Sequence, residues 1–387
     1  MIDKSIAIIL YANIDYYPST IDTVRILENE YKVVIFSRNI CGQFESFGKN
    51  AILYKFGKYS SIREGEEKSG LSKLIEYLLF TLKTVRYSAK HKCKSVIAYD
   101  SYSLVTAVVL KLFDPQIKVF YHAHEIIELG TSKWYHLRYW MERVTLKHAK
   151  DCVWVSQPDI KRARFFGEMT GIKDVKVMRN FALRDFKYPA ERLALCEKLK
   201  MDGYTICIFT GAIGKKSYME DLVKFTETSD MKIAIFISGF ICEEGIEDIL
   251  KNGNNNKHLS KLIYLGFLPK KDMYGLLNSA DFALVLYMPS FMAEMNAGSS
   301  AKVGAYAAFG LPVIYPSFWD YEAYYKEIGL KYSDGGELIE RIKDMAKNHD
   351  LRARLSENAK RMFREKMNFE SEFGELKKTI DHYMGVK

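Results

Sequence analysis

With 387 residues, of which 48% are hydrophobic and 27% charged, the chain predicts a soluble protein of two or three domains with sizeable cores. No run of about 18 or more apolar residues occurs, which argues against a transmembrane helix. The net charge of +9 lies in residues 1–183, with 28 Lys and Arg against 19 Asp and Glu, whereas residues 184–387 contain 29 of each. This asymmetry indicates an anionic partner for the first half only.

The first half alternates strand-like and helical patterns. Its apolar runs are SIAIILYA, KVVIFS, AILYKF, SVIAYD, KVFYHAH and DCVWVS, and helical stretches such as 71–89 and 134–149 lie between several of them. Continuously apolar runs are typical of parallel strands buried on both faces. We interpret the first run as a strand and not as a signal peptide.

The same alternation begins again in the second half. The runs YTICIFTG, KIAIFISG, KLIYLGF, DFALVLY and LPVIYP are separated by helices, and helices at 336–347, 351–364 and 369–384 end the chain. We therefore predict an α/β protein with two doubly wound, Rossmann-like domains, at 1–183 and 184–367, followed by a terminal helix at 368–387. Ligands of such sheets bind at the carboxyl ends of strands, so the loops after the strands are the candidate sites.

Two glycine-bearing turns in the second half are candidates for binding an anion. The first, IFTGAIGKKSYMEDL, contains Gly211 and Gly214, followed by Lys215 and Lys216. Glycine lets a ligand approach the backbone, and the free N–H groups of a following helix attract phosphate. An ordinary turn with solvated lysines is the alternative.

The second turn, NAGSSAKVGAYAAFGLP, leads into a helix expected to start near residue 301. Asn296, Ser299 or Ser300 could cap this helix. Lys302 falls in its first turn, where the helix dipole disfavours a cation, so we interpret Lys302 as a phosphate ligand. The two turns together suit a diphosphate that is held without a metal ion.

Other features bear on the donor and on cofactors. In YLGFLPKKDM, Phe267 could stack on a nucleobase and Leu268 offers backbone groups, although a plain connecting loop explains the segment nearly as well. No D-x-D motif occurs and the histidines do not cluster, so we expect no metal and no other cofactor. The six cysteines form no C-x-x-C motif, which indicates reduced thiols in the cytoplasm.

Polar residues also follow the strands of the first half. In YHAHEIIEL, His124 and Glu125 end a strand, and His122 lies two residues back on the same side. Asp100 ends the preceding strand and could orient His124 or meet an acceptor. The alternatives are core histidines and a helix-capping aspartate. Asp15 and Tyr16, in the loop after the first strand, are weaker candidates for the same site.

A basic segment, at 81–94, precedes the strand that ends at Asp100. It contains Lys83, Arg86, Lys90, Lys92 and Lys94. A solvated helix face is the alternative to a membrane contact, in which each basic residue near an anionic leaflet contributes roughly 1 kcal/mol. We expect residues 83–94 to hold the protein at the inner face of a membrane. No nucleic-acid-binding motif accompanies the charge, so we expect no nucleic acid partner.

These segments resemble glycosyltransferases of the GT-B fold that use nucleotide-sugar donors, above all the retaining family with an E-x7-E signature. NAGSSAKVGAYAAFGLPVI is similar to the donor-binding segment of that family, with Lys302, Tyr306, Gly310 and Pro312 in register. YHAHEIIEL, MERVTLKHAKDCVWVS and VMRNF are similar to further family segments. The resemblance spans nearly the whole chain.

The signature acids of the resembled family fall on Ala297 and Ala305 here. In the family, the second acid holds the ribose hydroxyls and the first lies near the donor sugar. Glu294 is the nearest acid that could substitute. Losing a charged hydrogen bond to ribose costs roughly 1.5–3 kcal/mol, which weakens binding without abolishing activity. The identities of the nucleotide and the sugar therefore stay open.

The resemblance implies two domains facing across a cleft, with a C-terminal helix crossing back to the first. It implies a cytoplasmic glycosyltransferase, peripheral to a membrane, that moves a sugar to a lipid-linked or growing glycan in cell-surface polysaccharide synthesis, such as capsule or O-antigen. Its catalytic residues would be His124, Asp100 and Glu294, and its acceptor contacts Asp15, Tyr16, His122 and Glu125. The alternatives are a non-catalytic GT-B partner or glycan-binding protein, favoured by Ala297 and Ala305, and a sugar-nucleotide epimerase.

Overall fold

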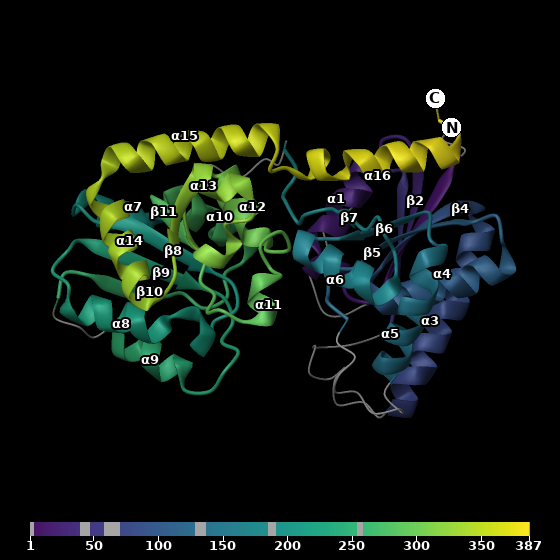
Figure 1. Cartoon of the computed structure of the whole chain (residues 1–387), viewed down its shortest axis with the longest axis horizontal. Helices are drawn as coiled ribbons and strands as arrows, with labels where there is room; N and C mark the ends of the chain where they lie inside the picture. Colours follow the sequence, from purple (N-terminus) through teal and green to yellow (C-terminus); the bar gives the residue numbers. More distant parts are fainter. Residues whose placement is uncertain are drawn as a thin grey trace. The chain divides into compact units, whose positions relative to one another are not determined.

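The computed structural model describes residues 4–38, 47–57, 70–127, 137–184, 191–253 and 258–386. The chain forms two compact units, coloured by sequence in Figure 1. Unit 1 consists of Met1–Asn180 and Glu372–Lys387, and unit 2 consists of Phe181–Ser371.

A seven-stranded parallel sheet forms the centre of unit 1, in the order β3-β2-β1-β4-β5-β6-β7. The strands are β1 (Ser5–Leu10), β2 (Lys32–Arg38), β3 (Ala51–Phe56), β4 (Cys93–Tyr99), β5 (Lys118–His122), β6 (Trp154–Gln157) and β7 (Lys176–Val177). All six residues of β1 are buried, as expected for a central parallel strand with both faces covered.

The helices of unit 1 connect these strands. They are η1 (Ile14–Tyr16), α1 (Pro18–Leu27), α3 (Gly70–Lys90), α4 (Asp100–Phe113), α5 (Leu137–His148), η2 (Ala149–Asp151) and α6 (Ile160–Thr170). The expected helix at 134–149 is thus seen from residue 137, and its first three residues lie outside the described part of the chain.

The last helix, α16 (Phe369–Met384), packs on unit 1 along most of its length. The Tyr31 hydroxyl donates a hydrogen bond of 2.5 Å to Asp381, and the Lys377 ammonium lies 2.8 Å from both Glu30 and Asp381. In Figure 1 this yellow helix runs beside the purple first strands. The expected return of the C-terminal helix to the first domain is therefore confirmed.

Unit 2 contains a six-stranded parallel sheet in the order β10-β9-β8-β11-β12-β13. The strands are β8 (Thr205–Thr210), β9 (Ile233–Ser238), β10 (Lys261–Tyr264), β11 (Phe282–Leu284), β12 (Val313–Pro316) and β13 (Gly329–Tyr332). Two separate apolar clusters cover the two faces of the sheet, because alternate residues of a strand point to opposite sides. The predicted pair of doubly wound parallel sheets is confirmed.

The helices of unit 2 follow the strands in the same alternation. They are α7 (Ala194–Met201), η3 (Lys215–Ser217), α8 (Met219–Thr228), α9 (Ile246–Gly253), α10 (Lys270–Ser279), α11 (Phe291–Glu294), α12 (Ala301–Ala308), η4 (Ser317–Trp319), α13 (Ala323–Ile328), α14 (Gly335–Lys347) and α15 (His349–Glu365). None of the helices in the described residues of either unit combines the length and apolar character that a bilayer crossing requires.

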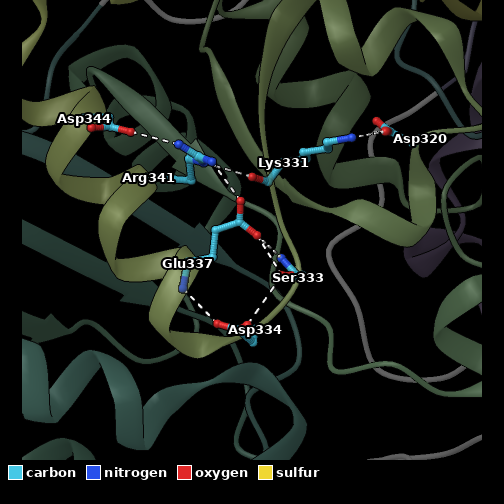
Figure 2. A network of polar contacts seen from close by, with 7 residues as sticks. All are labelled: Asp320, Lys331, Ser333, Asp334, Glu337, Arg341 and Asp344. Atoms are coloured by element: carbon cyan, nitrogen blue, oxygen red, sulfur yellow. Dashed lines mark hydrogen bonds and ion pairs between the residues drawn. The ribbon is translucent and has the colours of Figure 1, made fainter.

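A network of polar contacts fixes the start of α14 to the loop that precedes it (Figure 2). Asp334 caps the helix, because its carboxylate accepts a hydrogen bond of 2.9 Å from the Glu337 N–H. The Glu337 carboxylate in turn accepts bonds of 2.7 Å from the Ser333 hydroxyl and from the Arg341 guanidinium. Arg341 also reaches Asp344, so one side chain joins two turns of the helix.

The Glu337 carboxylate should make the stability of unit 2 depend on pH. The hydrogen bond from Ser333, and then that from Arg341, lower the pKa of Glu337 below its ordinary value of 4.5. The contribution of the ionised Glu337 to the free energy of unfolding is therefore complete above pH 4.5, and it is lost as the pH falls through the lowered pKa. Glu337→Gln should reduce the free energy of unfolding at pH 7 by about 1 kcal/mol or less, because the group is partly exposed.

Urea unfolding of both proteins at pH 7 and at a pH below the lowered pKa measures this effect. The two proteins should differ at pH 7 and converge in acid. A difference that is the same at both pH values would show that the charge of Glu337 is irrelevant.

Candidate functional site

Three glycines close the carboxyl ends of β8, β9 and β10. Gly211, Gly239 and Gly266 all have positive φ, at 132°, 150° and 68°. The Gly239 N–H donates a bond of 2.9 Å to the Gly266 carbonyl, and a Cβ atom on Gly239 would lie 1.7 Å from the Gly211 carbonyl oxygen. Only glycine permits this contact between backbones, so the three loops are fixed against one another.

Lys302 lies in the first turn of α12, as predicted, beside the loop of Gly211. Its Nζ atom is 4.9 Å from the centroid of the Phe209 ring and 4.8 Å from that of Tyr287. Within the described part of the chain, no carboxylate pairs with this ammonium group. The two rings stabilise the cation without neutralising it, so its charge is available to an anion.

Two contacts hold α12 in place relative to β8. The Tyr306 hydroxyl, which is fully buried, accepts a bond of 3.0 Å from the Thr210 N–H and lies 2.9 Å from the Thr210 Oγ1 atom. Burial raises the pKa of Tyr306, so this phenol stays neutral. A Cβ atom on Gly304 would lie 2.9 Å from the Phe181 ring, which packs on the same helix. Lys302 is thus positioned by the buried side of α12.

The turn before α12 leaves one hydroxyl group without a partner. The Ser300 N–H donates to the Asn296 carbonyl at 2.9 Å, and the Ser299 hydroxyl donates to the Asn296 side chain at 3.2 Å. Ser300 occupies the capping position, yet its buried Oγ atom makes no hydrogen bond with any described residue. The expected cap is therefore present in position only, because Ser300 stands at the N-cap of α12 and its side chain makes no capping hydrogen bond.

The Gly214 turn differs from the anion-binding turn that we expected at this position. It continues into the short helix η3, and Glu243, from the loop after β9, accepts a hydrogen bond of 3.1 Å from the Lys215 N–H. A carboxylate of the protein therefore lies where a phosphate was expected. This contact could not be predicted from a local pattern, because 28 residues separate the two partners. The assignment of Lys215 and Lys216 to phosphate stays a prediction.

The two positions at which the resemblance leads us to expect the signature acids are apolar and packed. Ala297 is 1% exposed, and its carbonyl accepts a bond of 2.8 Å from the Tyr325 hydroxyl. Ala305 is partly buried against the same core cluster. Glu294 ends α11 and is half-buried, and its carbonyl accepts a bond from the Tyr321 hydroxyl. A carboxylate at position 297 would require this core to rearrange.

Phe267 and Leu268 differ in their exposure to solvent. Phe267 is 73% exposed, so its ring is available for stacking, whereas Leu268 packs against the core of unit 2.

No described group of His, Cys, Asp and Glu residues is arranged to hold a metal ion.

In unit 1, Asp100 holds the loop that follows β5. Asp100 begins α4 in a left-handed conformation, with φ of 65°. Its carboxylate accepts bonds of 2.7 Å from the His124 N–H and 3.2 Å from the Glu125 N–H, and it lies 3.3 Å from the His124 Nδ1 atom. The predicted contact between Asp100 and His124 is present, and the carboxylate binds this loop instead of capping its own helix.

The His124 side chain is buried inside unit 1, at 7% exposure. Its Nε2 atom lies 2.9 Å from the Ser19 hydroxyl, and its ring stacks on Tyr99 at a centroid distance of 4.9 Å. Both ring nitrogens thus have partners within the unit. His122 is fully buried, and burial lowers its pKa well below 6.5, so it is neutral. A catalytic role for His124 stays a prediction.

Asp15 and Tyr16 form most of the short helix η1. Both carboxylate oxygens of Asp15 are buried and make no hydrogen bond to a described residue, whereas Tyr16 is exposed. Their assignment to the acceptor stays a prediction.

A cavity of about 280 Å³ lies at the carboxyl ends of β1, β4 and β5, and we call it the unit 1 cavity. Its charged lining residues are Asp100, Glu125, Arg138 and Glu142. Desolvation and then the neighbouring Asp100 carboxylate raise the pKa of Glu125. Arg138 and Glu142 were not predicted from the sequence, although their spacing of four residues on one helix is that of an ion pair.

Comparisons with known proteins agree with this architecture. Residues 225–377 match the model of a family described as glycosyl transferase-like. Sucrose-phosphate synthase from Thermosynechococcus elongatus is 13% identical, with a TM-score of 0.70 over 99% of this chain and 100% of that one. HepE of Anabaena, solved with UDP and glucose, is 12% identical, with a TM-score of 0.63 over 98% and 100%.

The lipopolysaccharide outer core galactosyltransferase WaaB, in its apo form, is also similar, with 12% identity and a TM-score of 0.58 over 98% of this chain and 99% of that one. No curated protein sequence matches the chain. At these identities, the likeness to solved structures establishes the fold. The chain thus has the GT-B fold, and its residues 225–377 match the model of a family described as glycosyl transferase-like.

Proposed function

We propose that the protein transfers a sugar from a nucleotide diphosphate donor, held by unit 2, to a lipid-linked or growing glycan acceptor, held by unit 1. The observation that carries the proposal is the unpaired Lys302 ammonium, which lies over two aromatic rings beside Gly211 at the start of α12. HepE binds UDP and glucose in a similar fold, which supports a donor of this class.

The donor diphosphate in this proposal lies against α12, and Lys215 and Lys216 would reach it from η3 only with their side chains. At η3 the Glu243 carboxylate already accepts the Lys215 N–H, and it would repel a phosphate. At α12 the free N–H groups of the helix and the Lys302 ammonium both favour negative charge. As the bond to the sugar breaks, charge develops on the departing diphosphate, and fixed positive groups stabilise it there. Lys302 supplies this charge without a metal ion.

Further donor contacts are proposed in the turn before α12 and in the loop that follows β10. Ser300, whose buried hydroxyl lacks a partner, can donate to a phosphate oxygen, and Asn296 and Ser299 form the same turn. Phe267 offers its exposed ring to the nucleobase, with Leu268 beside it. Glu294 is the acid that remains near this turn, in place of the resembled family's signature.

The acceptor in this proposal approaches the carboxyl ends of β4 and β5. Asp100 and Glu125 line the unit 1 cavity, and His124 lies directly behind Asp100. Asp15 and Tyr16 would complete the acceptor surface. His122, which is fully buried, would act on the acceptor only through His124, whose ring centroid lies 5.1 Å from its own. Retention of configuration is proposed from the resembled family alone.

A non-catalytic glycan-binding protein of the same fold is the second candidate. It is favoured by Ala297 and Ala305, which place apolar residues where the resembled family has its acids. The two candidates differ in nucleotide binding, which only the transferase requires.

We propose that the protein is cytoplasmic and peripheral to the membrane, and that it reaches its acceptor at the inner membrane surface. There it would take part in cell-surface polysaccharide synthesis. Helix α3 supports this part of the proposal. Leu71, Ile75, Leu78 and Leu82 recur along one face of the helix and are 49–69% exposed. The basic residues of 83–94 lie in the last part of the same helix and directly after it. Apolar residues beside lysines and arginines are typical of helices that lie in a bilayer interface.

Substitution of Lys302 tests the transferase. Lys302→Ala should weaken binding of a nucleotide diphosphate by roughly ten- to a hundredfold, because a charged hydrogen bond is lost, and should leave nucleoside binding nearly unchanged. Calorimetric titration of UDP and uridine into both proteins measures the difference.

Lys326→Ala, in α13 of the same unit, is the control and should bind UDP normally. Equal losses of UDP and uridine affinity in Lys302→Ala would show that the lysine only supports the fold. If the unaltered protein binds no nucleotide diphosphate at all, the glycan-binding candidate replaces the transferase.

Substitution on α3 tests the membrane contact. The double variant Leu78→Gln, Leu82→Gln should bind anionic phosphatidylglycerol vesicles at least tenfold more weakly, because each leucine that enters the bilayer contributes about 1.5–3 kcal/mol. Binding of the unaltered protein should also fall with added salt, which screens the basic residues.

Vesicle sedimentation measures both effects, and Leu195→Gln, an exposed leucine of unit 2, is the matched control. Vesicle binding that survives both salt and the double substitution would exclude α3 as the contact.

A further inference from the structure

Glu142 carries an unsatisfied carboxylate oxygen inside unit 1. The residue is 3% exposed on α5, and its Oε1 atom accepts a bond of 2.7 Å from the Arg138 guanidinium. Its Oε2 atom is buried and makes no hydrogen bond to any residue that the structure describes. Buried charged oxygens are almost always paired in proteins, because leaving one unpaired is costly. Since Glu142 lines the unit 1 cavity, a ligand there can supply the missing donor.

The charge of the unit 1 cavity is opposite to that of the surrounding sequence. Among the described residues, three carboxylates line it, from Asp100, Glu125 and Glu142, together with the guanidinium of Arg138. The Arg38 guanidinium lies 4.9 Å from the centroid of the Tyr11 ring, but Arg38 is not among the described residues that line the cavity. The basic excess of residues 1–183 is therefore located elsewhere. A ligand in this cavity has to bring hydrogen-bond donors and not negative charge.

Aromatic side chains form the walls of the cavity. Tyr11, Tyr17, Tyr99 and Tyr102 line it, and the rings of Tyr11 and Tyr102 are stacked at a centroid distance of 5.2 Å. A small-molecule site typically combines such apolar walls with a few polar groups that fix orientation. A sugar ring matches this pattern, because its C–H face packs on an aromatic ring while its hydroxyls donate to carboxylates. The volume of about 280 Å³ suits one small ring.

We propose that the unit 1 cavity binds one sugar residue that carries neither phosphate nor carboxylate, and that Glu142 selects it by accepting a hydroxyl or ammonium hydrogen at Oε2. That this sugar belongs to the acceptor rests on the function proposed above, whereas the selectivity of the cavity does not. The diphosphate of a lipid-linked acceptor would have to lie outside the cavity.

The test compares three matched probes on the full chain at pH 7. Glucose, glucosamine and glucose 6-phosphate are titrated by ligand-detected NMR, and the corresponding galactose and mannose sets follow. In at least one set, the neutral and the amino sugar should bind, and the 6-phosphate should bind at least tenfold more weakly.

Glu142→Gln separates a ligand contact from a structural role. The variant should bind the neutral sugar roughly tenfold more weakly, because the acceptor oxygen and its charge are lost, and should bind the amino sugar more weakly still. Its affinity for the 6-phosphate should not fall. A general disturbance of the fold would weaken all three probes together. Glu168→Gln, an exposed acid on α6, is the control and should leave all three affinities unchanged.

Arg138→Gln provides a second variant, should Glu142→Gln fail to fold. The Arg138 side chain is largely exposed, and its removal makes the cavity more negative. This variant should therefore favour glucosamine over glucose more strongly than the unaltered protein does. The proposal is overturned if the 6-phosphate binds as tightly as the neutral sugar, if no neutral or amino sugar binds, or if Arg138→Gln strengthens binding of the 6-phosphate.

These results are independent of the donor site. If UDP does not bind but the sugar selectivity is found, the proposed transferase function is wrong and the proposed sugar site is supported. If UDP binding depends on Lys302 but the cavity accepts phosphorylated sugars, only the present inference fails.

Discussion

Burial of the two parallel sheets on both faces determines where this protein can do chemistry. Strands such as β1 and β8 have no solvated face, so a polar side chain on them would need a buried partner. Polar groups are therefore concentrated where the strands end. Asp100 directly follows β4, and the Tyr306 hydroxyl meets the last residue of β8. The candidate donor and acceptor residues occupy these strand ends in both units.

Much of this arrangement could be predicted from local patterns. Continuous apolar runs identified the long strands, and helical periodicity located α14, α15 and α16 to within two residues at either end. The strands that escaped prediction, β7 and β13, have two and four residues and carry lysines, so they lack a strong apolar signal. Short edge strands of this kind are defined by the neighbour with which they pair, which a local pattern does not contain.

The site could be predicted only where its parts are close in sequence. Lys302 and the turn before α12 form one continuous segment. Their position at the start of a helix could therefore be predicted from a local pattern. The contact of Glu243 with the Lys215 N–H joins loops that follow two different strands. The packing of Ala297 under Tyr325 depends on the core as a whole. The sign of the unit 1 cavity could not be predicted either, because a net charge summed over 183 residues says nothing about one cavity.

The conformation of Asp100 limits what can replace it during evolution. A left-handed residue other than glycine costs roughly 1–2 kcal/mol, and aspartate and asparagine bear it best. Glycine would remove the strain but also the carboxylate that holds the His124 and Glu125 N–H groups. Alanine would keep the strain and lose the bonds. Asparagine alone retains both a tolerated backbone conformation and an acceptor oxygen. It is therefore the one substitution of Asp100 that we expect to cost little stability.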